Sequence, residues 1–379
     1  MATKTLKLTS LILVLTLIVG TFSSAIVSAQ NQKLQKVTLA TSPFQDTLLP
    51  IVGKELGWYE DEGLDVDIRL LSWNEAMESL TAGAADVAVN NISSVIGTYN
   101  NNPQIIYFYG MNTFDSGFAL TIRPDSKWKT VEEFEEELGS HEEAVMAAAE
   151  QLRNMTVVTT GNTDMEQGVA TLANMAGLDF KEQVNIIDMS PSDGLAAFLT
   201  GTGDAYIGGA AQREGAVTRG MEVMISGSDL GAPPINGYVT TKEFAKNNGD
   251  ALLKLIHVWF KSVRYINSNF EEGAQIIIDR LNEKTGSNMT VENFREKYWN
   301  NYEHFLPSPI AVQNDILSPD GHNYWKDRWD SGNFYFGELK TTIEKEVPYS
   351  ACWIEKAQEA YLEKYYGEDY KRWFPNIDL

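Results

Sequence analysis

Apolar and polar positions alternate along the first third of the chain in the order that strands and helices produce. Residues 36–40 (KVTLA) form a short β-rich run, a polar segment follows, and apolar residues then recur at helical spacing up to Gly57. A second β-rich run occupies residues 64–71, and the apolar runs at residues 86–89 and 105–109 predict two further strands. Strands that alternate with helices indicate an α/β fold, with a mainly parallel sheet and helices on both faces.

One helix–strand unit occurs twice in the sequence. Ser72, with Glu75 three residues later, forms a capping-box pattern, and the helix that it starts ends at Gly83. Residues 72–89 align without a gap on residues 190–207, so that caps, apolar positions, terminal glycines and strand starts correspond. Two α/β lobes of one plan are predicted, although unrelated helix–strand units also share this general pattern.

Two extended segments join the predicted lobes. Residues 118–126 and 235–244 stand where a chain would leave lobe one and return to it, which predicts a double-strand hinge. Two long amphipathic helices follow at residues 250–269 and 271–286, and then comes an aromatic-rich tail, whose aromatic residues we interpret as core or lobe-packing residues. The predicted organisation is a signal peptide at 1–29, lobe one with C-terminal helices at 30–122 and 240–379, and lobe two at 123–239.

The N-terminus has the pattern of an export signal. Lys4 and Lys7 precede the apolar residues 11–20, and small residues end at Ala29. An uncleaved anchor helix is the alternative. The sequence has 379 residues, and the part that follows this segment is long enough for two lobes that each bury a core.

Composition excludes several classes of function. The formal net charge of −22 disfavours nucleic acid and anionic membranes. Cys352 is the only cysteine, and the four His residues lack zinc-site spacing, so neither a disulfide framework nor a zinc enzyme is expected. We interpret the acidic residues 131–143 as a solvated helix face and not as a metal site.

Loops that follow the predicted strands hold the candidate binding residues, because ligands of open α/β sheets bind at the carboxyl ends of strands. These loops are rich in Ser, Thr, Asn and Gly, which form hydrogen bonds without charge, and they contain few bases or nucleophiles. Arg213 either clamps an acidic group of the solute or pairs with a surface acid, and Asp193 is equally interpretable as a helix cap. The candidates are Ser42, Phe44, Gln45, Trp73, Asn74, Asn91, Ser93, Thr160, Gly161, Asn162, Asp193, Gln212 and Arg213. Of these, we expect Trp73, Asn91, Thr160, Asn162 and Arg213 to converge on one cleft.

Catalytic patterns are absent from these loops. No His lies in them, so a Ser-His-Asp arrangement is not expected, and the sequence contains no phosphate-loop motif. The glycine-rich residues 199–211 follow a predicted helix, and we interpret their first glycines as the end of that helix. We therefore predict no catalytic residues, no metal and no cofactor.

Several segments resemble the nitrate/sulfonate/taurine branch of ABC-transporter solute-binding proteins, which is related to the thiamine-pyrimidine-precursor binders. The stretch LPIVGKELGWYEDEGLDVDI at 49–68 matches a family motif, and ESLTAGAADVAV at 78–89 and NGYVTTKEFAKNN at 236–248 match two more. The residues after the strand at 205–208 depart from the family pattern, which puts the usual ligand residues in doubt. The matching residues of the first motif are Gly57, Trp58, Tyr59, Gly63, Leu64 and Val66.

This resemblance implies a type II periplasmic-binding-protein fold and an exported, monomeric protein. Its function would be to capture a small solute between two lobes and deliver it to an ABC permease with its ATPase. Contact with the membrane would occur only through the permease or an uncleaved N-terminal anchor. Helix N-termini at the cleft would favour an anion or the acidic end of a zwitterion, whereas the negative charge of the whole protein acts in the opposite direction.

Two alternatives remain at this point. One is an enzyme of the same fold that resembles the pyrimidine synthase of thiamine biosynthesis, although that family carries a cysteine cluster and this chain has Cys352 alone. The other is an extracytoplasmic sensor domain.

Overall fold

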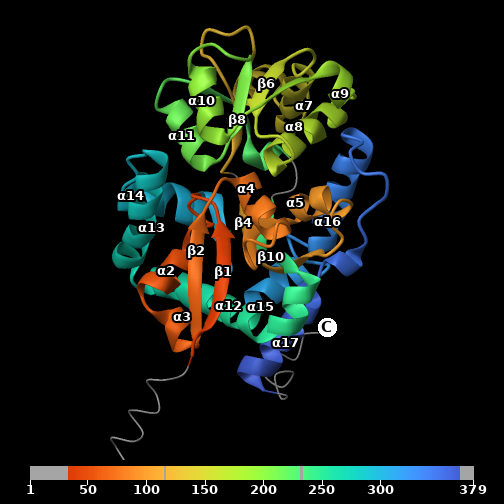
Figure 1. Cartoon of the computed structure of the whole chain (residues 1–379). Coiled ribbons are helices and arrows are strands. Elements are labelled where there is room, and N and C mark those ends of the chain that lie inside the picture. Colours follow the sequence, from red (N-terminus) through yellow and green to blue (C-terminus); the bar gives the residue numbers. More distant parts are fainter. Residues whose placement is uncertain (1–32, 115–116, 231–233, 368–379) are drawn as a thin grey trace, which may run out of the picture.

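Two lobes, one above the other, form the computed structural model of the protein (Figure 1). The structure describes residues 33–114, 117–230 and 234–367. The predicted signal peptide at 1–29 lies outside the described residues. No helix in the described ranges is both long and apolar enough to cross a membrane.

Lobe one is built on a mixed sheet with the strand order β11-β4-β10-β3-β1-β2. β1 pairs in parallel with β2 and β3, whereas β10 is antiparallel to β3 and β4, and β11 is antiparallel to β4. The strands are β1 (Gln35–Thr41), β2 (Leu64–Leu70), β3 (Val87–Asn91), β4 (Ile105–Phe114), β10 (Ile235–Thr241) and β11 (Glu303–Phe305).

Lobe two repeats this arrangement with the strand order β7-β6-β8-β5-β9. Here β6 pairs in parallel with β7 and β8, and β5 is antiparallel to both β8 and β9. The strands are β5 (Ala119–Ile122), β6 (Thr156–Thr159), β7 (Asn185–Asp188), β8 (Ala205–Gly208) and β9 (Glu222–Ser226).

Helices cover the faces of both sheets. Those of lobe one before the first crossing are α2 (Leu49–Glu55), α3 (Trp58–Asp61), α4 (Trp73–Thr81) and α5 (Ile92–Tyr99). Those of lobe two are α6 (Val131–Leu138), α7 (His141–Glu150), α8 (Asp164–Met175), α9 (Phe180–Gln183), α10 (Pro191–Leu199) and α11 (Ala210–Val217). After the return come α12 (Lys242–Ser268), α13 (Phe270–Thr285), α14 (Val291–Asn293), α15 (Pro309–Val312), α16 (Trp325–Phe334) and α17 (Ile354–Tyr366). Short 3₁₀ and π-helical segments are η1 (Gly227–Asp229), η2 (Phe294–Tyr302), η3 (Gln313–Leu317), η4 (Tyr335–Leu339) and η5 (Tyr349–Ala351).

The repeat predicted from the sequence is present down to single hydrogen bonds. In lobe one the Asp86 carboxylate accepts the backbone N–H of Thr38 at 2.8 Å, and in lobe two Asp204 accepts that of Thr156 at the same distance. Both pairs are 48 residues apart. Each aspartate thus ties the start of the third parallel strand to the first strand of its lobe.

Helix caps also correspond between the lobes, with one difference. Ser72 and Glu75 form the complete capping box at α4. At α10 the Ser190 hydroxyl accepts the N–H of Asp193, but it also donates to the Asp193 carboxylate, which therefore does not complete the box. Gly83 and Gly201 follow the two helices with φ values of +72° and +110°, which only glycine adopts without strain.

The two crossings lie slightly earlier in the chain than the predicted boundaries at 122 and 240. The boundary at 122 assigns β5 to lobe one, whereas its hydrogen bonds place it in the sheet of lobe two. The boundary at 240 assigns most of β10 to lobe two, whereas β10 lies in the sheet of lobe one. An extended run has the same sequence pattern whichever sheet it joins, so the pattern alone does not identify its partner strands.

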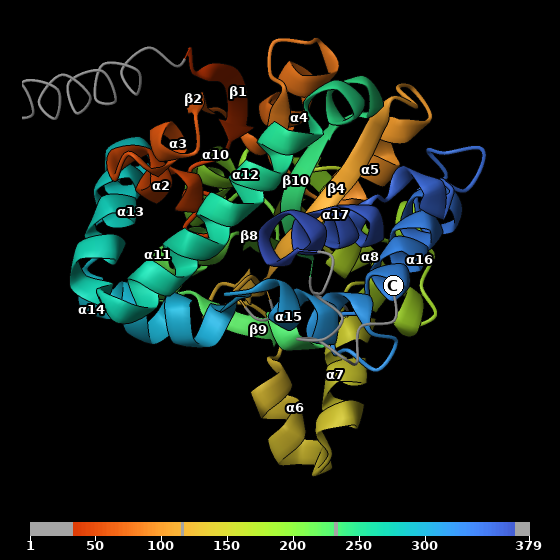
Figure 2. The same ribbon diagram turned by 90° about the horizontal axis from the view of Figure 1, so that it is seen from below.

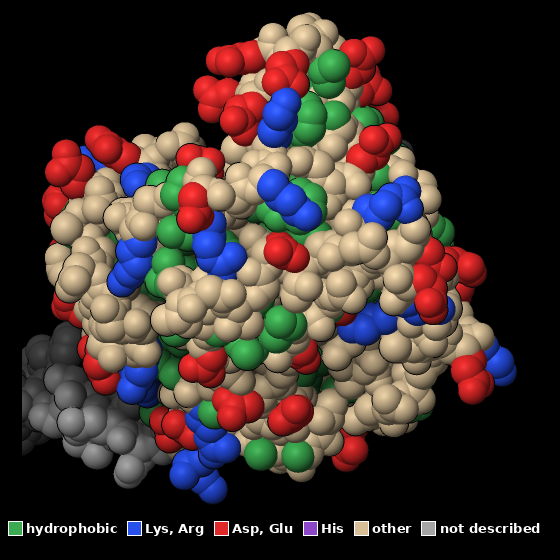
Figure 3. Space-filling model, turned by 90° about the horizontal axis from the view of Figure 1, so that it is seen from above, with side chains coloured by type: hydrophobic (Ala, Val, Ile, Leu, Met, Phe, Trp, Pro, Cys, Tyr) green, Lys and Arg blue, Asp and Glu red, His purple; other side chains and the backbone are tan. Residues whose placement is uncertain are grey.

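A helical hairpin, α6–α7, projects from lobe two (Figure 2). Residues 131–143 were expected to form one helix face, but Gly139, at φ +74°, ends α6, and Ser140 caps α7. Acidic side chains surround this projection (Figure 3). Among the described residues, no group of three or more His, Cys, Asp or Glu side chains could hold a metal ion.

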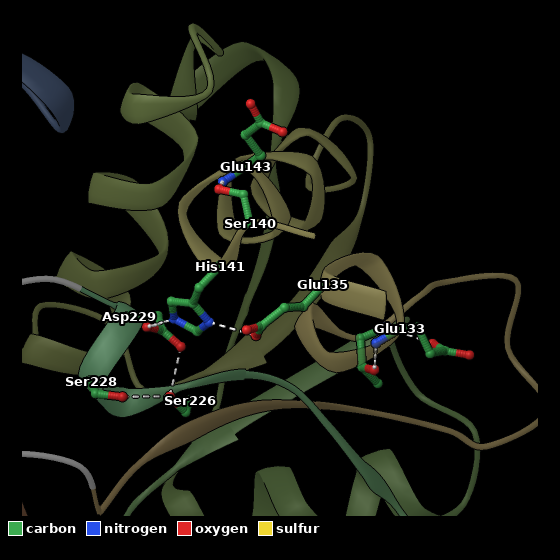
Figure 4. Close-up of polar contacts among 9 residues, drawn as sticks. Glu133, Glu135, Ser140, His141, Glu143, Ser226, Ser228 and Asp229 are labelled. Carbon is green, nitrogen blue, oxygen red and sulfur yellow. Dashed lines mark hydrogen bonds and ion pairs between the residues drawn. The ribbon is translucent and has the colours of Figure 1, made fainter. Parts of the chain in front are cut away.

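One exposed histidine ties this hairpin to the start of the second crossing. The His141 ring lies between Glu135 of α6 and Asp229 of η1, at 2.9 and 3.0 Å (Figure 4). Asp229 also accepts a hydrogen bond from Ser226 at 2.8 Å. The hydrogen bond with Glu135, followed by that with Asp229, raises the pKa of His141 to about 8.

The C-terminal third packs on lobe one and contacts lobe two on both sides (Figure 1). On one side Lys297 and Tyr302 of η2 bind Glu214 of α11. On the other, Glu166 of α8 accepts hydrogen bonds from the Tyr335 hydroxyl at 2.6 Å and from the Lys340 ammonium at 2.5 Å. Several of the aromatic residues pack as predicted, with Trp325 and Trp329 buried. The tail therefore connects the lobes, a role that its sequence did not reveal.

Candidate functional site

A cavity lies between the lobes at the carboxyl ends of the parallel strands. Its space, including the open mouth, is about 470 Å³. Both lobes form its walls, as expected for a ligand site in an open α/β fold. The lining residues are Phe44, Gln45, Asp46, Trp73, Phe114 and Asn236 from lobe one, and Thr160, Thr163, Asp164, Met165, Pro191 and Gly209 from lobe two.

Aromatic side chains form the apolar wall of the cavity in lobe one. Phe44 and Trp73 meet edge to face, with ring centroids 5.9 Å apart. Trp73 is the first residue of α4, so the Ser72 cap sets its position, and its indole N–H donates to the Ser94 hydroxyl at 3.2 Å. The Trp73 ring is therefore held in a fixed position by its own lobe.

Asp46 is the acidic group of lobe one. Its side chain is only 3% exposed, and its carboxylate accepts a hydrogen bond from the Asn236 amide at 2.5 Å. Burial raises the pKa of Asp46 to about 6, although the hydrogen bond from Asn236 acts in the opposite direction. The negative charge of Asp164 raises this pKa further.

Asp164 is the acidic group of lobe two and the first residue of α8. Its carboxylate accepts a hydrogen bond from the Asn91 amide, which belongs to lobe one, at 2.9 Å. The loss of bulk water between the lobes raises its pKa to about 6 as well. Two carboxylates, one from each lobe, thus line a single cavity.

Two amide oxygens of the lining have no hydrogen-bond donor among the described residues. The Gln45 amide nitrogen donates to Glu303 at 2.6 Å, and the Asn236 nitrogen donates to Asp46. Turning either amide group over would place its oxygen against a carboxylate oxygen. The two carboxylates therefore fix the positions of the nitrogen and the oxygen in each amide. Gln45 Oε1 and Asn236 Oδ1 are therefore buried acceptors without a donor in the described part of the chain.

The lobes are in direct contact beside the cavity. Besides the bond between Asn91 and Asp164, the Ser93 hydroxyl of α5 donates to Gln167 of α8 at 2.6 Å. The Gln167 amide in turn donates to Ser331 of α16 at 2.9 Å. The two lobes are thus joined by hydrogen bonds beside the cavity.

Of the candidates from the sequence, four line the cavity: Phe44, Gln45, Trp73 and Thr160. Asn91 and Ser93 lie next to it, where they bind Asp164 and Gln167 across the lobes. Ser42 is buried in the same loop as Phe44, and its hydroxyl has no partner among the described residues.

The remaining candidates have other surroundings. Asn74 and Asn162 line a separate surface hollow. The Gly161 N–H donates to Asp188 at 2.8 Å, and Asp193 lies exposed in the first turn of α10. Gln212 and Arg213 are on α11, where Gln212 is buried and the Arg213 guanidinium lies 5.1 Å from the centre of the Tyr302 ring. Of the five residues expected to converge, Trp73 and Thr160 share the cavity, Asn91 adjoins it, and Asn162 and Arg213 are not among its lining residues.

Sequence reasoning missed the two acidic residues, although a signal for them exists. Ser190 follows Ser72 by 118 residues, and Asp164 follows Asp46 by the same 118. Each aspartate ends a polar loop, TSPFQD or TTGNTD, that begins with the last residue of the first strand of its lobe. Extending the repeat upstream at constant offset would have aligned Asp46 with Asp164.

Comparison with known proteins identifies the family. The sequence profile of the NMT1-like family matches residues 30–280, more than half of the chain. The chain belongs to the NMT1-like family. Its membership agrees with the resemblance found in the sequence. No curated protein sequence matches the chain.

Solved structures show that this NMT1-like protein has the fold of periplasmic binding proteins. The aliphatic sulphonate binding protein SsuA of Escherichia coli has a TM-score of 0.61 and 14% identity, over 84% of this chain and 91% of its own. The alkanesulfonate-binding SsuA of Xanthomonas axonopodis has a TM-score of 0.62 and 10% identity, over 85% and 99%. The nitrate-binding protein NrtA of Synechocystis has a TM-score of 0.53 and 17% identity, over 69% of each chain. The predicted periplasmic-binding-protein fold is confirmed.

Proposed function

We propose that this protein is the solute-binding component of an ABC importer and captures a small polar solute between its two lobes. The observation that carries the proposal is the cavity, which is lined by both lobes and contains one carboxylate from each of them, Asp46 and Asp164. Buried polar groups normally have hydrogen-bond partners, so a polar solute that supplies donors would pair with these carboxylates.

Binding would favour the closed arrangement of the lobes. A solute that touches both walls interacts with more groups when the lobes are closed, and it therefore shifts the population toward that form. The bond between Asn91 and Asp164 joins the lobes beside the cavity and would form as they close.

Structural neighbours suggest candidate solutes. Two are described as sulfonate-binding proteins and one as a nitrate-binding protein. The family resemblance of the sequence adds taurine-like compounds and pyrimidine precursors to this starting set. The closed protein would then dock on an ABC permease with its ATPase at the outer face of the membrane. We propose an exported monomer for this role.

Binding, and not catalysis, is the function that the cavity supports best. Neither a His nor a Cys occurs among its lining residues, and the two carboxylates are held by amides and not by a nucleophile. The residues of the described site therefore give no support to the pyrimidine-synthase-like alternative.

A thermal-shift screen of the mature protein tests the proposal. The panel contains nitrate, taurine, alkanesulfonates, short carboxylates and pyrimidine precursors, together with simple amines. A ligand of the cavity raises the melting temperature with the logarithm of its concentration. If no compound raises it, while one of them is chemically converted, the protein is an enzyme and the proposal is wrong.

A further inference from the structure

We propose that the solute is an organic cation, an alkyl- or aryl-ammonium or a protonated heteroaromatic amine, whose charged nitrogen lies between Asp46 and Asp164. The inference rests on the proposed function and specifies the chemical class that the same cavity accepts. It departs from the sulfonates and nitrate that the structural neighbours bind.

Hydrogen-bond donors in the lining are the first line of argument. The hydroxyls of Thr160 and Thr163 donate to backbone carbonyls at 2.8 and 2.6 Å, and the Trp73 indole donates to Ser94. The amide nitrogens of Gln45 and Asn236 donate to carboxylates. Each side-chain donor atom of the lining thus already has an acceptor within the protein, whereas the carboxylates of Asp46 and Asp164 can accept further hydrogen bonds. The cavity is therefore complementary to a solute that donates hydrogen bonds.

Charge is the second line of argument. The lining contains two carboxylates and neither a Lys nor an Arg. An anion such as a sulfonate would bring a third negative charge into a site with little water to screen it, and no cation of the lining would offset it. A cation would instead form charge-assisted hydrogen bonds with both carboxylates. Burial has raised the pKa of both Asp46 and Asp164, as expected for carboxylates that lack a positive partner.

The apolar walls decide between an organic cation and a metal ion. Phe44, Trp73, Phe114, Met165 and Pro191 line the same cavity. Aromatic faces attract organic cations and cover hydrocarbon, but they supply no ligands for a hard metal ion. Among the described residues, no group of three or more acidic, His or Cys side chains has the arrangement of a metal site.

Helix N-termini do not reverse this preference. Four helices, α4, α8, α10 and α11, begin at the cavity, and their free N–H groups alone would favour an anion. However, Ser72 and Ser190 cap α4 and α10, and α8 begins with the carboxylate of Asp164. Two of the four helix ends thus have side-chain caps and a third carries a carboxylate, whereas α11, with Gly209 at its N-cap, has no side-chain cap.

Isothermal titration calorimetry with matched probes tests the inference. Benzylamine, phenethylamine, ethylamine and tetramethylammonium supply the cations at pH 7.5. Benzyl alcohol supplies a neutral match, and benzoate, ethanesulfonate, taurine, nitrate and calcium chloride complete the panel. We expect at least one organic cation to bind tenfold or more tightly than any neutral or anionic probe.

Variants assign the effect to the two carboxylates. Asp46→Asn and Asp164→Asn each weaken binding of the preferred cation by about 10- to 100-fold, because a hydrogen bond to a charged group is lost. Asp61→Asn and Asp125→Asn are the matched controls, since these acids are exposed, one on each lobe. Both controls keep the affinity within about twofold, the range of ordinary surface substitutions.

The outcomes separate this inference from the proposed function. If a neutral or anionic probe binds most tightly, and if Asp46→Asn leaves its affinity unchanged or improves it, the inference of a cationic solute is wrong. The proposal that the protein captures a solute would still stand. Binding of calcium without any organic cation also contradicts it. If no probe binds, solute capture and the cation are both contradicted.

Discussion

The two lobes bring equivalent aspartates to the cavity but hold them in different ways. Asp46 is bound by Asn236, a residue of its own lobe, and is almost fully buried. Asp164 is bound by Asn91 of the other lobe and keeps part of its side chain accessible. Opening the lobes would therefore remove the partner of Asp164 and leave that of Asp46 in place. In the proposed function, lobe one would be the prebuilt half of the site, and lobe two would complete it on closure.

The largest loss of stability is expected from a change at the contact between Asn236 and Asp46, which lies within lobe one. Asn236→Asp places a second carboxylate against buried Asp46, so one of the two must stay protonated or the pair repels. We expect the free energy of unfolding to fall by about 2–4 kcal/mol at pH 7, measured by urea denaturation. The loss should be smaller at pH 4, where the carboxyls are protonated. An equal loss at both pH values would contradict the assigned cause.

The matching change across the cleft is expected to open the lobes without unfolding them. Asn91→Asp keeps an acceptor for the Ser94 N–H at the start of α5, because Asp is an equally good cap, but it repels Asp164. Small-angle scattering should show a larger radius of gyration than the wild type at pH 7. The change in unfolding free energy should stay below about 1 kcal/mol, within the range of minor substitutions.

A scattering profile identical to that of the wild type would mean that the bond between Asn91 and Asp164 does not help to hold the lobes together. If Asn91→Asp lowered the free energy of unfolding as much as Asn236→Asp, the contact between the lobes would matter as much for folding as the contact within lobe one. That result would contradict the comparison.

Removing the buried charge of lobe one should stabilise the ligand-free protein. The pKa of Asp46, about 6, lies above the value of 3.8 for an unperturbed Asp, so the folded state binds the proton more tightly. This stabilisation is complete below pH 3.8 and is lost as the pH rises through 6. Asp46→Asn should therefore raise the unfolding free energy at pH 7, by roughly 1–3 kcal/mol, and leave it nearly unchanged at pH 4.

The corresponding gain for Asp164→Asn should be smaller, because this side chain is less buried and occupies the N-terminus of α8, which favours a negative charge. Denaturation of both variants at the two pH values measures the difference. A larger gain from Asp164→Asn would reverse the comparison between the lobes.

The smallest effect is expected on the exposed surface of lobe two. The pKa of His141, about 8, lies above its ordinary value of 6.5, so its contacts with Glu135 and Asp229 stabilise the fold fully below pH 6.5. This contribution disappears as the pH rises through 8. The melting temperature of His141→Gln should lie slightly below that of the wild type at pH 6 and coincide with it at pH 9. A difference that grows with pH would contradict this account.

Local patterns in the sequence predicted the local structure well. The capping box at Ser72 and the terminal glycines at positions 83 and 201 depend on residues a few positions apart, and they are present in the structure. The aligned repeat consists of two copies of such a local pattern, and it is present as well. The same patterns could not assign β5 and β10 to their sheets, because pairing depends on strands far away in the chain.

The site was less predictable for the same reason. Asn236 and its partner Asp46 are 190 residues apart, and only the return of the chain along β10 brings them together. Arg213 was a predicted ligand residue because it is a cation in a predicted loop. Its guanidinium instead lies beside Tyr302, which belongs to the aromatic tail, and the sequence did not reveal the position of that tail. Asp193 instead lies in the first turn of α10, where its carboxylate accepts a hydrogen bond from the capping Ser190 hydroxyl.

A co-crystal structure with the tightest-binding probe tests the central claim most directly. We predict the nitrogen of the probe within hydrogen-bonding distance of both Asp46 and Asp164, and its apolar part against Trp73. A probe bound outside the cavity between the lobes, or one whose acidic group lies against these carboxylates, would contradict the account.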